Sequence, residues 1–231
     1  MRRYFLFGVI GLLLSCDNED VVKNQAVGEA LGTSYNIIYL SHEVVDYQKE
    51  IDSVFQVVNQ SLSTYIPSSD ISRINQGDTL VKVDHMFKEV FHLSKKVYRA
   101  TNGYFDPTVG TLVNAWGFGP EKKIVMDSIK VDSLLQFVGF DKVNLTNEDI
   151  VEKKNTNIYF DFNAVAKGYA IDRVAAMLSS NGLQHYLVEV GGEIVAKGRN
   201  MVKGKPWVVG IDDPEAEDGL ALKLVINLEN R

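Results

Sequence analysis

Residues 157–178 read NIYFDFNAVAKGYAIDRVAAML, and the fold prediction starts from this stretch. Residues 158–162 are rich in aromatic and β-branched side chains, which favour a short strand. Asn163 can then cap a helix, because its side chain can accept a hydrogen bond from a free amide one turn later. Apolar residues recur beyond it at helical spacing, namely Ala166, Ala170, Val174, Met177 and Leu178. The stretch therefore predicts a strand, a sharp turn and a helix.

The predicted helix start carries a carboxylate and an ammonium group, on Asp161 and Lys167. Together with the free amides of a helix N-terminus, these groups suit a phosphate with a metal ion close by. A purely structural alternative stays open on these residues alone. In that alternative Asp161 serves the helix dipole and Lys167 is a solvated side chain.

Composition sets the class of protein. The chain has 231 residues, of which 45% are hydrophobic and 23% are charged, as in an ordinary folded protein. Its formal net charge of -6, with no basic stripe, argues against nucleic acid as a partner. Cys16 is the only cysteine in the sequence, which excludes an internal disulfide framework.

The N-terminus has the pattern of an export signal. Two arginines precede an apolar run over residues 4–14, which is too short for a comfortable membrane span. The run ends in Leu-Leu-Ser-Cys and resembles a bacterial lipobox, so we expect a signal peptide over residues 1–15 and lipidation, such as palmitate, at Cys16. A plain secretory signal with an incidental cysteine is the alternative. Residues 16–29 are predicted to be a tether, and the protein is predicted to be a membrane-anchored lipoprotein facing the periplasm.

The rest of the chain alternates between strand and helix patterns. Helices are predicted at 51–62, 69–75, 85–100 and 131–140, and strands at 30–40, 81–83, 143–145, 150–151, 185–190, 193–196, 207–211 and 222–228. The strands come in clusters separated by helices. This order favours an α+β fold with mixed or antiparallel sheets and packed helices.

Several kinds of chemistry have no signature here. The four histidines lack metal-ligand spacing, and there is no G-x-S-x-G elbow, Walker loop or G-x-G-x-x-G. Oxygen chemistry remains, from Asp106, Asp161 and Asp212, and such ligands favour magnesium or calcium. Tyr104 and Phe105 stand in a turn-rich loop, where they either close the core or flank a flat ligand.

Five stretches, taken together, resemble the ApbE family of FAD:protein FMN transferases. They are LGT at 31–33, LSTY at 62–65 with SDISRIN at 69–75, GYFDPTVG at 103–110, DFNAVAKGYAID at 161–172 and VGGE at 190–193. Each is weak alone, but their order and spacing agree with the family over about residues 30–231.

The resemblance implies a T-fold-like architecture and a reaction. Members bind FAD with Mg2+, cleave its pyrophosphate and join the FMN half to a threonine or serine hydroxyl. The acceptor implied is a flavoprotein subunit of a membrane redox complex. The FAD-contact positions of the family fall here on Leu31, Tyr65, Tyr104, Phe105, Asp106, Asp161 and Lys167. The backbone carbonyl of Ala164 falls on a metal-ligand position.

One departure limits the expectation. Family members continue past this point with a histidine-containing segment and late metal ligands, whereas this chain stops at Arg231. The resemblance therefore predicts a C-terminally incomplete flavin transferase domain with no assignable catalytic histidine. Two alternatives follow: a lipoprotein that binds FAD or hydrolyses it to FMN and AMP, and a non-enzymatic lipoprotein that retains only the family outline. The target protein, the choice of membrane and the oligomeric state are not encoded in recognisable motifs.

Overall fold

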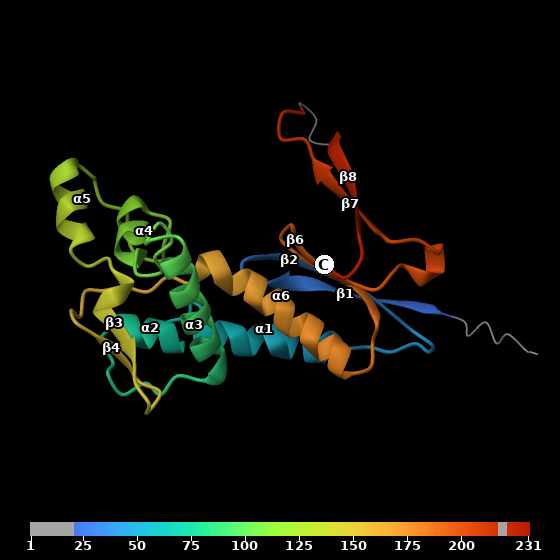
Figure 1. Ribbon diagram of the computed structural model, residues 1–231, viewed down its shortest axis with the longest axis horizontal. Coiled ribbons are helices and arrows are strands. Elements are labelled where there is room, and N and C mark those ends of the chain that lie inside the picture. The colour runs from blue at the N-terminus through green and yellow to red at the C-terminus, as the bar shows by residue number, and fades with distance from the viewer. Residues whose placement is uncertain (1–20, 217–220) are drawn as a thin grey trace, which may run out of the picture.

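A four-stranded antiparallel sheet and two long helices form the centre of the molecule. The computed structural model describes residues 21–216 and 221–231. The sheet has the order β1-β2-β5-β6, with β1 at Val22–Ala30, β2 at Thr33–Ser41, β5 at His185–Val190 and β6 at Glu193–Lys197. Helices α1 (Gln48–Leu62) and α6 (Asn163–Ser180) lie side by side against one face of this sheet (Figure 1).

The remaining elements lie around this centre (Figure 1). They are α2 (Asp70–Asn75), α3 (His85–Ala100), α4 (Gly110–Trp116), α5 (Ser128–Leu135), β3 (Val143–Leu145), β4 (Val151–Lys153), β7 (Trp207–Asp212) and β8 (Leu222–Leu228), with short 3-10 turns at Phe140–Lys142 and Met201–Lys203. Strands β3 and β4 form one antiparallel hairpin and β7 and β8 another. The described strands therefore pair antiparallel throughout, which confirms the predicted α+β class.

The core follows from alternation in β2 and β5. Tyr35, Ile37 and Tyr39 of β2 are opposite Val190, Val188 and Tyr186 of β5, and all six side chains are buried. Because successive strand residues point to opposite faces, these residues form one apolar layer under the helices. The apolar stripe of α1 and the buried face of α6 complete the same cluster.

The helix predictions were confirmed in most places. The predicted helix at 85–100 is α3, and the one at 51–62 is α1 with one further turn at its start. Ser69 caps α2 by accepting a hydrogen bond from the Ser72 amide. The prediction at 131–140 was wrong in its bounds, because the Asp127 side chain caps a helix that starts at residue 128 and ends at 135.

The tether predicted over residues 16–29 is wrong from residue 22 onward, where the chain forms β1. Every second residue of β1 faces the core, but the two fully buried ones are Asn24 and Ala26. A small and a polar residue on the inner face give no hydrophobic alternation, so the strand carries no sequence signal. Pairing with β2 along all nine residues supplies its hydrogen bonds instead. The predicted signal peptide over residues 1–15 and the predicted lipidation site Cys16 lie outside the described residues.

The strand predicted at 158–162 is also wrong. The segment is extended and buries Ile158, Phe160 and Phe162, but its only ladder contact among the described residues is an isolated bridge between Tyr159 and Val109. The Asn75 side chain replaces a neighbouring strand: it accepts from the Phe160 amide at 2.7 Å and donates to the Phe160 carbonyl at 2.9 Å. The strand predicted at 81–83 is likewise reduced to one bridge, from Lys82 to Ile150.

Replacing Asn75 by alanine is expected to lower the free energy of unfolding by about 2 kcal/mol. The substitution leaves the amide and carbonyl of a buried residue, Phe160, without partners, and each such group costs roughly 1–3 kcal/mol. Chemical denaturation of both proteins measures the difference. Gln76→Ala, on the exposed neighbouring position, serves as the control and is expected to change stability by under about 0.5 kcal/mol. Equal effects of the two substitutions would contradict the role of Asn75.

Candidate functional site

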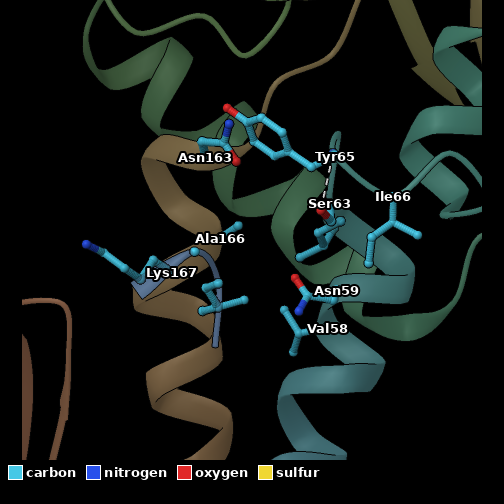
Figure 2. A pocket seen from close by; sticks show the side chains of 11 residues that line it. Val58, Asn59, Ser63, Tyr65, Ile66, Asn163, Ala166 and Lys167 are labelled. Carbon is cyan, nitrogen blue, oxygen red and sulfur yellow. Dashed lines mark hydrogen bonds between the residues drawn. The ribbon is translucent and has the colours of Figure 1, made fainter. Parts of the chain in front are cut away.

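A pocket of about 640 Å³ opens between α1, α6 and the turn that joins β1 to β2. Its lining comes from these elements and from the turn after α1: Leu31, Gly32, Val58, Asn59, Leu62, Ser63, Tyr65, Ile66, Asn163, Ala166 and Lys167. Figure 2 shows Asn163 and Ala166 of α6 across this space from side chains of α1 and its following turn, while the Lys167 side chain points away from α1. The volume lies within the range of small-molecule and cofactor sites.

Leu31 enters the pocket from a strained turn. Ala30 pairs with Thr33, so Leu31 and Gly32 form a two-residue hairpin loop. Both have positive φ, at 54° and 77°. A two-residue loop with two positive φ values matches the right-handed twist of the strands, yet a branched side chain there is strained. Such strain is concentrated at functional sites, and here it sets a half-buried leucine in the pocket wall.

Lys167 lines the opposite wall and is held by the turn between β5 and β6. Its ammonium lies 3.0 Å from Glu193 Oε1 and donates to the Gly191 carbonyl oxygen at 3.4 Å. The lysine side chain is 31% exposed, and the residue is part of the pocket lining. An ammonium in this place can balance a phosphate as a point charge.

Asp161 lies at the start of α6. Its Oδ1 accepts from the Asn163 amide at 2.7 Å, and its Oδ2 accepts from Asn163 Nδ2 at 3.3 Å. The prediction that Asn163 caps the helix is therefore wrong: Asn163 is the first helical residue and Asp161 supplies the side-chain oxygen. Burial raises the pKa of the Asp161 carboxyl group above its usual value. Asp161 is not part of the pocket wall, but its partner Asn163 is.

The loop over residues 103–110 runs beside Asp161. The Asp161 amide donates to the Pro107 carbonyl at 2.8 Å, which ties this loop to the start of α6. Within the loop, Asp106 Oδ1 accepts from the amide and hydroxyl of Thr108 at 2.8 and 2.6 Å. Its Oδ2 accepts from the Phe140 amide at 3.1 Å. The Asp106 carboxylate thus braces the loop.

The structure brings some of the predicted site residues together and not others. Leu31, Tyr65 and Lys167 share one pocket, and Ala164 is exposed on the first turn of α6 beside it. Tyr104 and Phe105 do not line the pocket, and Tyr104 is 97% exposed. A role for Tyr104, Phe105 and Asp106 in FAD binding stays a prediction.

Tyr65 forms the rim of the pocket. Its hydroxyl donates to the Phe118 carbonyl at 3.1 Å, and its ring is 58% exposed. Figure 2 shows this ring next to Asn163 at the start of α6. Phe118 itself is 78% exposed and is not part of the pocket lining.

Sequence reasoning missed several lining residues. Val58 and Leu62 are buried residues of α1, and both also line the pocket. Asn59 follows Val58 on the helix, and Ile66 stands in the turn after α1. A polar residue beside a predicted core face is the one signal that could have indicated Asn59.

The described residues hold no cluster of three or more His, Cys, Asp or Glu that could bind a metal by itself.

The sequence pattern of the ApbE family matches residues 31–231. The chain belongs to the ApbE family. It is similar to the FAD:protein FMN transferase of Haemophilus influenzae, with 35% identity over 94% of this chain and 66% of that protein. It is also similar to the same-named proteins of Vibrio cholerae (33%, covering 94% and 67%) and Escherichia coli K12 (31%, covering 79% and 54%).

Solved structures agree with this ApbE-family assignment. The flavin transferase ApbE from Vibrio cholerae matches with a TM-score of 0.82 and 32% identity, covering 91% of this chain and 70% of that one. The apo flavinyl transferase ApbE of Pseudomonas stutzeri matches with a TM-score of 0.78 and 28% identity, covering 90% and 67%. The chain spans about two thirds of the Haemophilus and Vibrio relatives and about half of the Escherichia coli relative.

Proposed function

We propose that this chain binds FAD in the pocket between α1 and α6 and transfers its FMN half to a threonine or serine hydroxyl of an acceptor protein. The observation that carries the proposal is the convergence of Leu31, Tyr65 and Lys167, from three separate segments, on one pocket. The similarity to proteins named FAD:protein FMN transferase supports the reaction type. The acceptor we propose is a flavoprotein subunit of a membrane redox complex.

In the proposed reaction the acceptor hydroxyl oxygen attacks the phosphorus of the FMN half. A new P–O bond forms, the bond to the AMP phosphate breaks, and AMP leaves. Such displacements depend on positioning and charge stabilisation more than on covalent enzyme intermediates. Lys167 balances the charge of the diphosphate, and the first amides of α6 lie where negative charge is favourable. The hydroxyl proton has no assigned acceptor in this chain.

The residues at the start of α6 fit a magnesium ion. Asp161 is a desolvated carboxylate whose hydrogen-bond partners are donors of Asn163, and Ala164 is exposed beside it. A hard cation prefers such oxygen donors. Mg2+ would supply neutralisation of the diphosphate charge, with Asp161 and the Ala164 carbonyl as protein ligands.

Replacing Lys167 by methionine is expected to weaken FAD binding by about 10- to 100-fold, since a hydrogen bond to a charged group is worth roughly 1.5–3 kcal/mol. The measurement is a thermal shift titration with FAD and Mg2+, since a ligand stabilises by RT ln(1 + [L]/Kd). Lys154→Met, on an exposed position, is the control and should bind FAD normally. If the wild-type protein shows no FAD-dependent shift in melting temperature, the chain is a lipoprotein without flavin function.

The products separate transfer from hydrolysis. Transfer adds the mass of FMN to a co-incubated acceptor and releases AMP, whereas hydrolysis releases free FMN and AMP without labelling the acceptor. Mass spectrometry of the acceptor and chromatography of the nucleotides measure both. AMP release without an acceptor adduct would show that the chain acts as an FAD pyrophosphatase and not as a transferase.

We also propose that the protein is a lipoprotein anchored through Cys16 on the periplasmic side of a membrane. The proposal rests on the sequence pattern of the first 16 residues. No helix among the described residues is both long and apolar enough to cross a membrane. Labelling of the expressed protein with palmitate, lost in Cys16→Ser, is the expected result; equal labelling of both proteins would contradict it.

A further inference from the structure

Glu193 is the carboxylate that pairs with Lys167. Its Oε1 lies 3.0 Å from the lysine ammonium, and the Gly191 carbonyl accepts from the same ammonium at 3.4 Å. Lys167 belongs to α6, whereas Gly191 lies in the β5–β6 turn and Glu193 is the first residue of β6. Glu193 itself does not line the pocket. It therefore contacts the binding residue without occupying the ligand space.

The turn that carries Glu193 is fixed in place. The Gly191 amide donates to the Ser34 carbonyl at 3.0 Å, and the Gly192 amide donates to Glu189 Oε1 at 2.7 Å. Gly191 has φ of 53°, and a Cβ there would lie 2.6 Å from Thr33 Cγ2, so only glycine lets the turn approach β2 this closely. Glu193 is thus presented by a rigid support.

A lysine side chain loses up to about 2 kcal/mol of conformational free energy when it is fixed in one rotamer. In this chain two acceptors already restrict the Lys167 ammonium, and its three N–H donors leave one for a ligand. A phosphate that meets a restricted ammonium gains the hydrogen bond without the full ordering cost. The pair also joins the sheet to the helix.

We propose that Glu193 is a positioning residue for phosphate recognition, which holds the Lys167 ammonium at the pocket wall for the diphosphate of the bound dinucleotide. This inference rests on the proposed binding of FAD in the same pocket. Its function is orientation by hydrogen bonding, so an uncharged acceptor of the same shape can replace it.

The test compares Glu193→Ala with Glu193→Gln. FAD binding is expected to weaken about tenfold in Glu193→Ala and to return to within about threefold of wild type in Glu193→Gln, which keeps an acceptor oxygen. Riboflavin, which has no phosphate, should bind all three proteins alike. Glu148→Ala, an exposed carboxylate elsewhere, controls for the change in net charge.

Three results would overturn the proposal. Tighter FAD binding in both variants would show that Glu193 competes with the ligand for Lys167. A parallel loss of FAD affinity, riboflavin affinity and melting temperature would show a general structural role. If FAD binding in Glu193→Gln remains as weak as in Glu193→Ala, the hydrogen bond does not orient Lys167.

A second readout needs no flavin and separates this inference from the proposed function. Acetic anhydride modifies free amines, and mass spectrometry gives the rate at Lys167 in the ligand-free protein. The rate is expected to rise several-fold in Glu193→Ala, relative to Lys154 in the same sample, and less in Glu193→Gln. An unchanged rate would refute the positioning of Lys167, whereas a raised rate without any FAD binding would refute only the proposed function.

Discussion

Replacing Lys153 by methionine is expected to lower the free energy of unfolding by about 3 kcal/mol. The Lys153 ammonium donates to three backbone carbonyls, of Ile74, Thr156 and Ile158, at 2.9, 3.0 and 2.9 Å. It therefore joins α2 and the end of β4 to the extended segment before α6. Methionine keeps the apolar stem but leaves three carbonyls without this donor, each costing roughly 1–3 kcal/mol, partly offset by removal of a desolvated charge.

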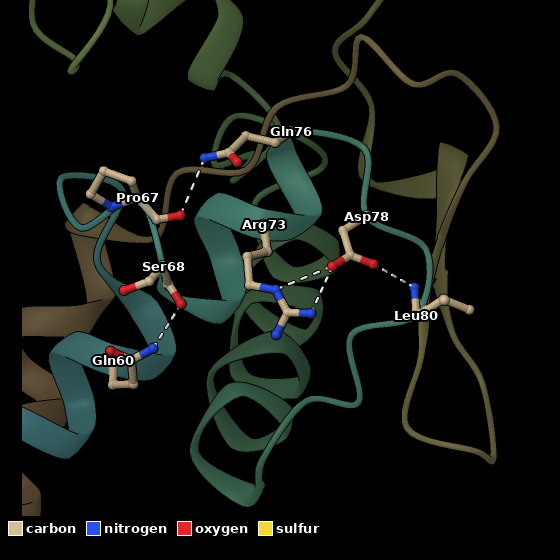
Figure 3. A network of polar contacts seen from close by, with 7 residues as sticks. All are labelled: Gln60, Pro67, Ser68, Arg73, Gln76, Asp78 and Leu80. Carbon is tan, nitrogen blue, oxygen red and sulfur yellow. Dashed lines mark hydrogen bonds and ion pairs between the residues drawn. The ribbon is translucent and has the colours of Figure 1, made fainter.

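Urea denaturation at neutral pH measures the loss, and Arg73→Met is the matched control. Arg73 lies on α2, the helix that Lys153 contacts. Its ion pair with Asp78 at 2.7 Å is exposed to solvent and belongs to a network of polar contacts (Figure 3). Exposed pairs contribute about 0–1 kcal/mol, so this control should change stability little. Losses of equal size in Lys153→Met and Arg73→Met would contradict the central role of Lys153.

The same lysine predicts a dependence on pH. Burial lowers the pKa of Lys153 to about 8, from the ordinary value of 10.5. Between these values the unfolded chain binds more protons than the folded one, so stability rises with pH across this interval. The stability of wild type relative to Lys153→Met should therefore increase between about pH 8 and pH 10.5. A difference that stays constant over this range would show that the folded state does not perturb Lys153.

Replacing Asp161 by asparagine is expected to weaken the binding of FAD with Mg2+ by about 100-fold or more, while the fold stays at least as stable. A desolvated charge that opposes a cation is costly to remove from the complex, at roughly 2–5 kcal/mol. Asparagine keeps an oxygen that can accept from the Asn163 amide, so the turn at the start of α6 retains this hydrogen bond. In the free protein the substitution removes a carboxylate whose burial is unfavourable to its charged form.

Titration calorimetry with FAD, with and without Mg2+, measures the binding loss, and thermal unfolding measures the stability. The control is Asp172→Asn, which removes an exposed carboxylate from the same helix. It should bind FAD as wild type does. If Asp161→Asn lowers the melting temperature by several degrees and binds FAD normally, Asp161 serves the helix start and the proposed ion site is wrong.

The long helices were predicted well from the local sequence. The apolar spacing that predicted α1 and α3 involves residues within one or two helical turns of each other, so it can be recognised without knowing which distant segments meet in the fold. The order of five short motifs likewise identified the family, because it needs no knowledge of contacts. Leu31, Tyr65 and Lys167 were assigned to one ligand in this way, and the structure places them around one pocket.

Long-range pairing was beyond such patterns. Strand β1 buries Asn24 and Ala26, which do not form a hydrophobic alternation that would predict a strand. It forms because all nine of its residues pair with β2. The aromatic run before α6 has the composition of a strand, yet Asn75 satisfies its buried backbone instead of a neighbouring strand. Strand propensity describes the kind of surface that a residue prefers. Which group hydrogen-bonds to its backbone depends on the tertiary structure.

By itself, the sequence determined the α+β class, the positions of the long helices and membership of the ApbE family, since these depend on spacing along the chain. The tertiary structure alone decided that Glu193 faces Lys167, that Lys153 joins three carbonyls, and that Val58, Asn59 and Ile66 line the pocket. The physical reason is that these contacts join segments far apart in the chain. Their geometry is fixed only when helices α1 and α6 pack on the common sheet.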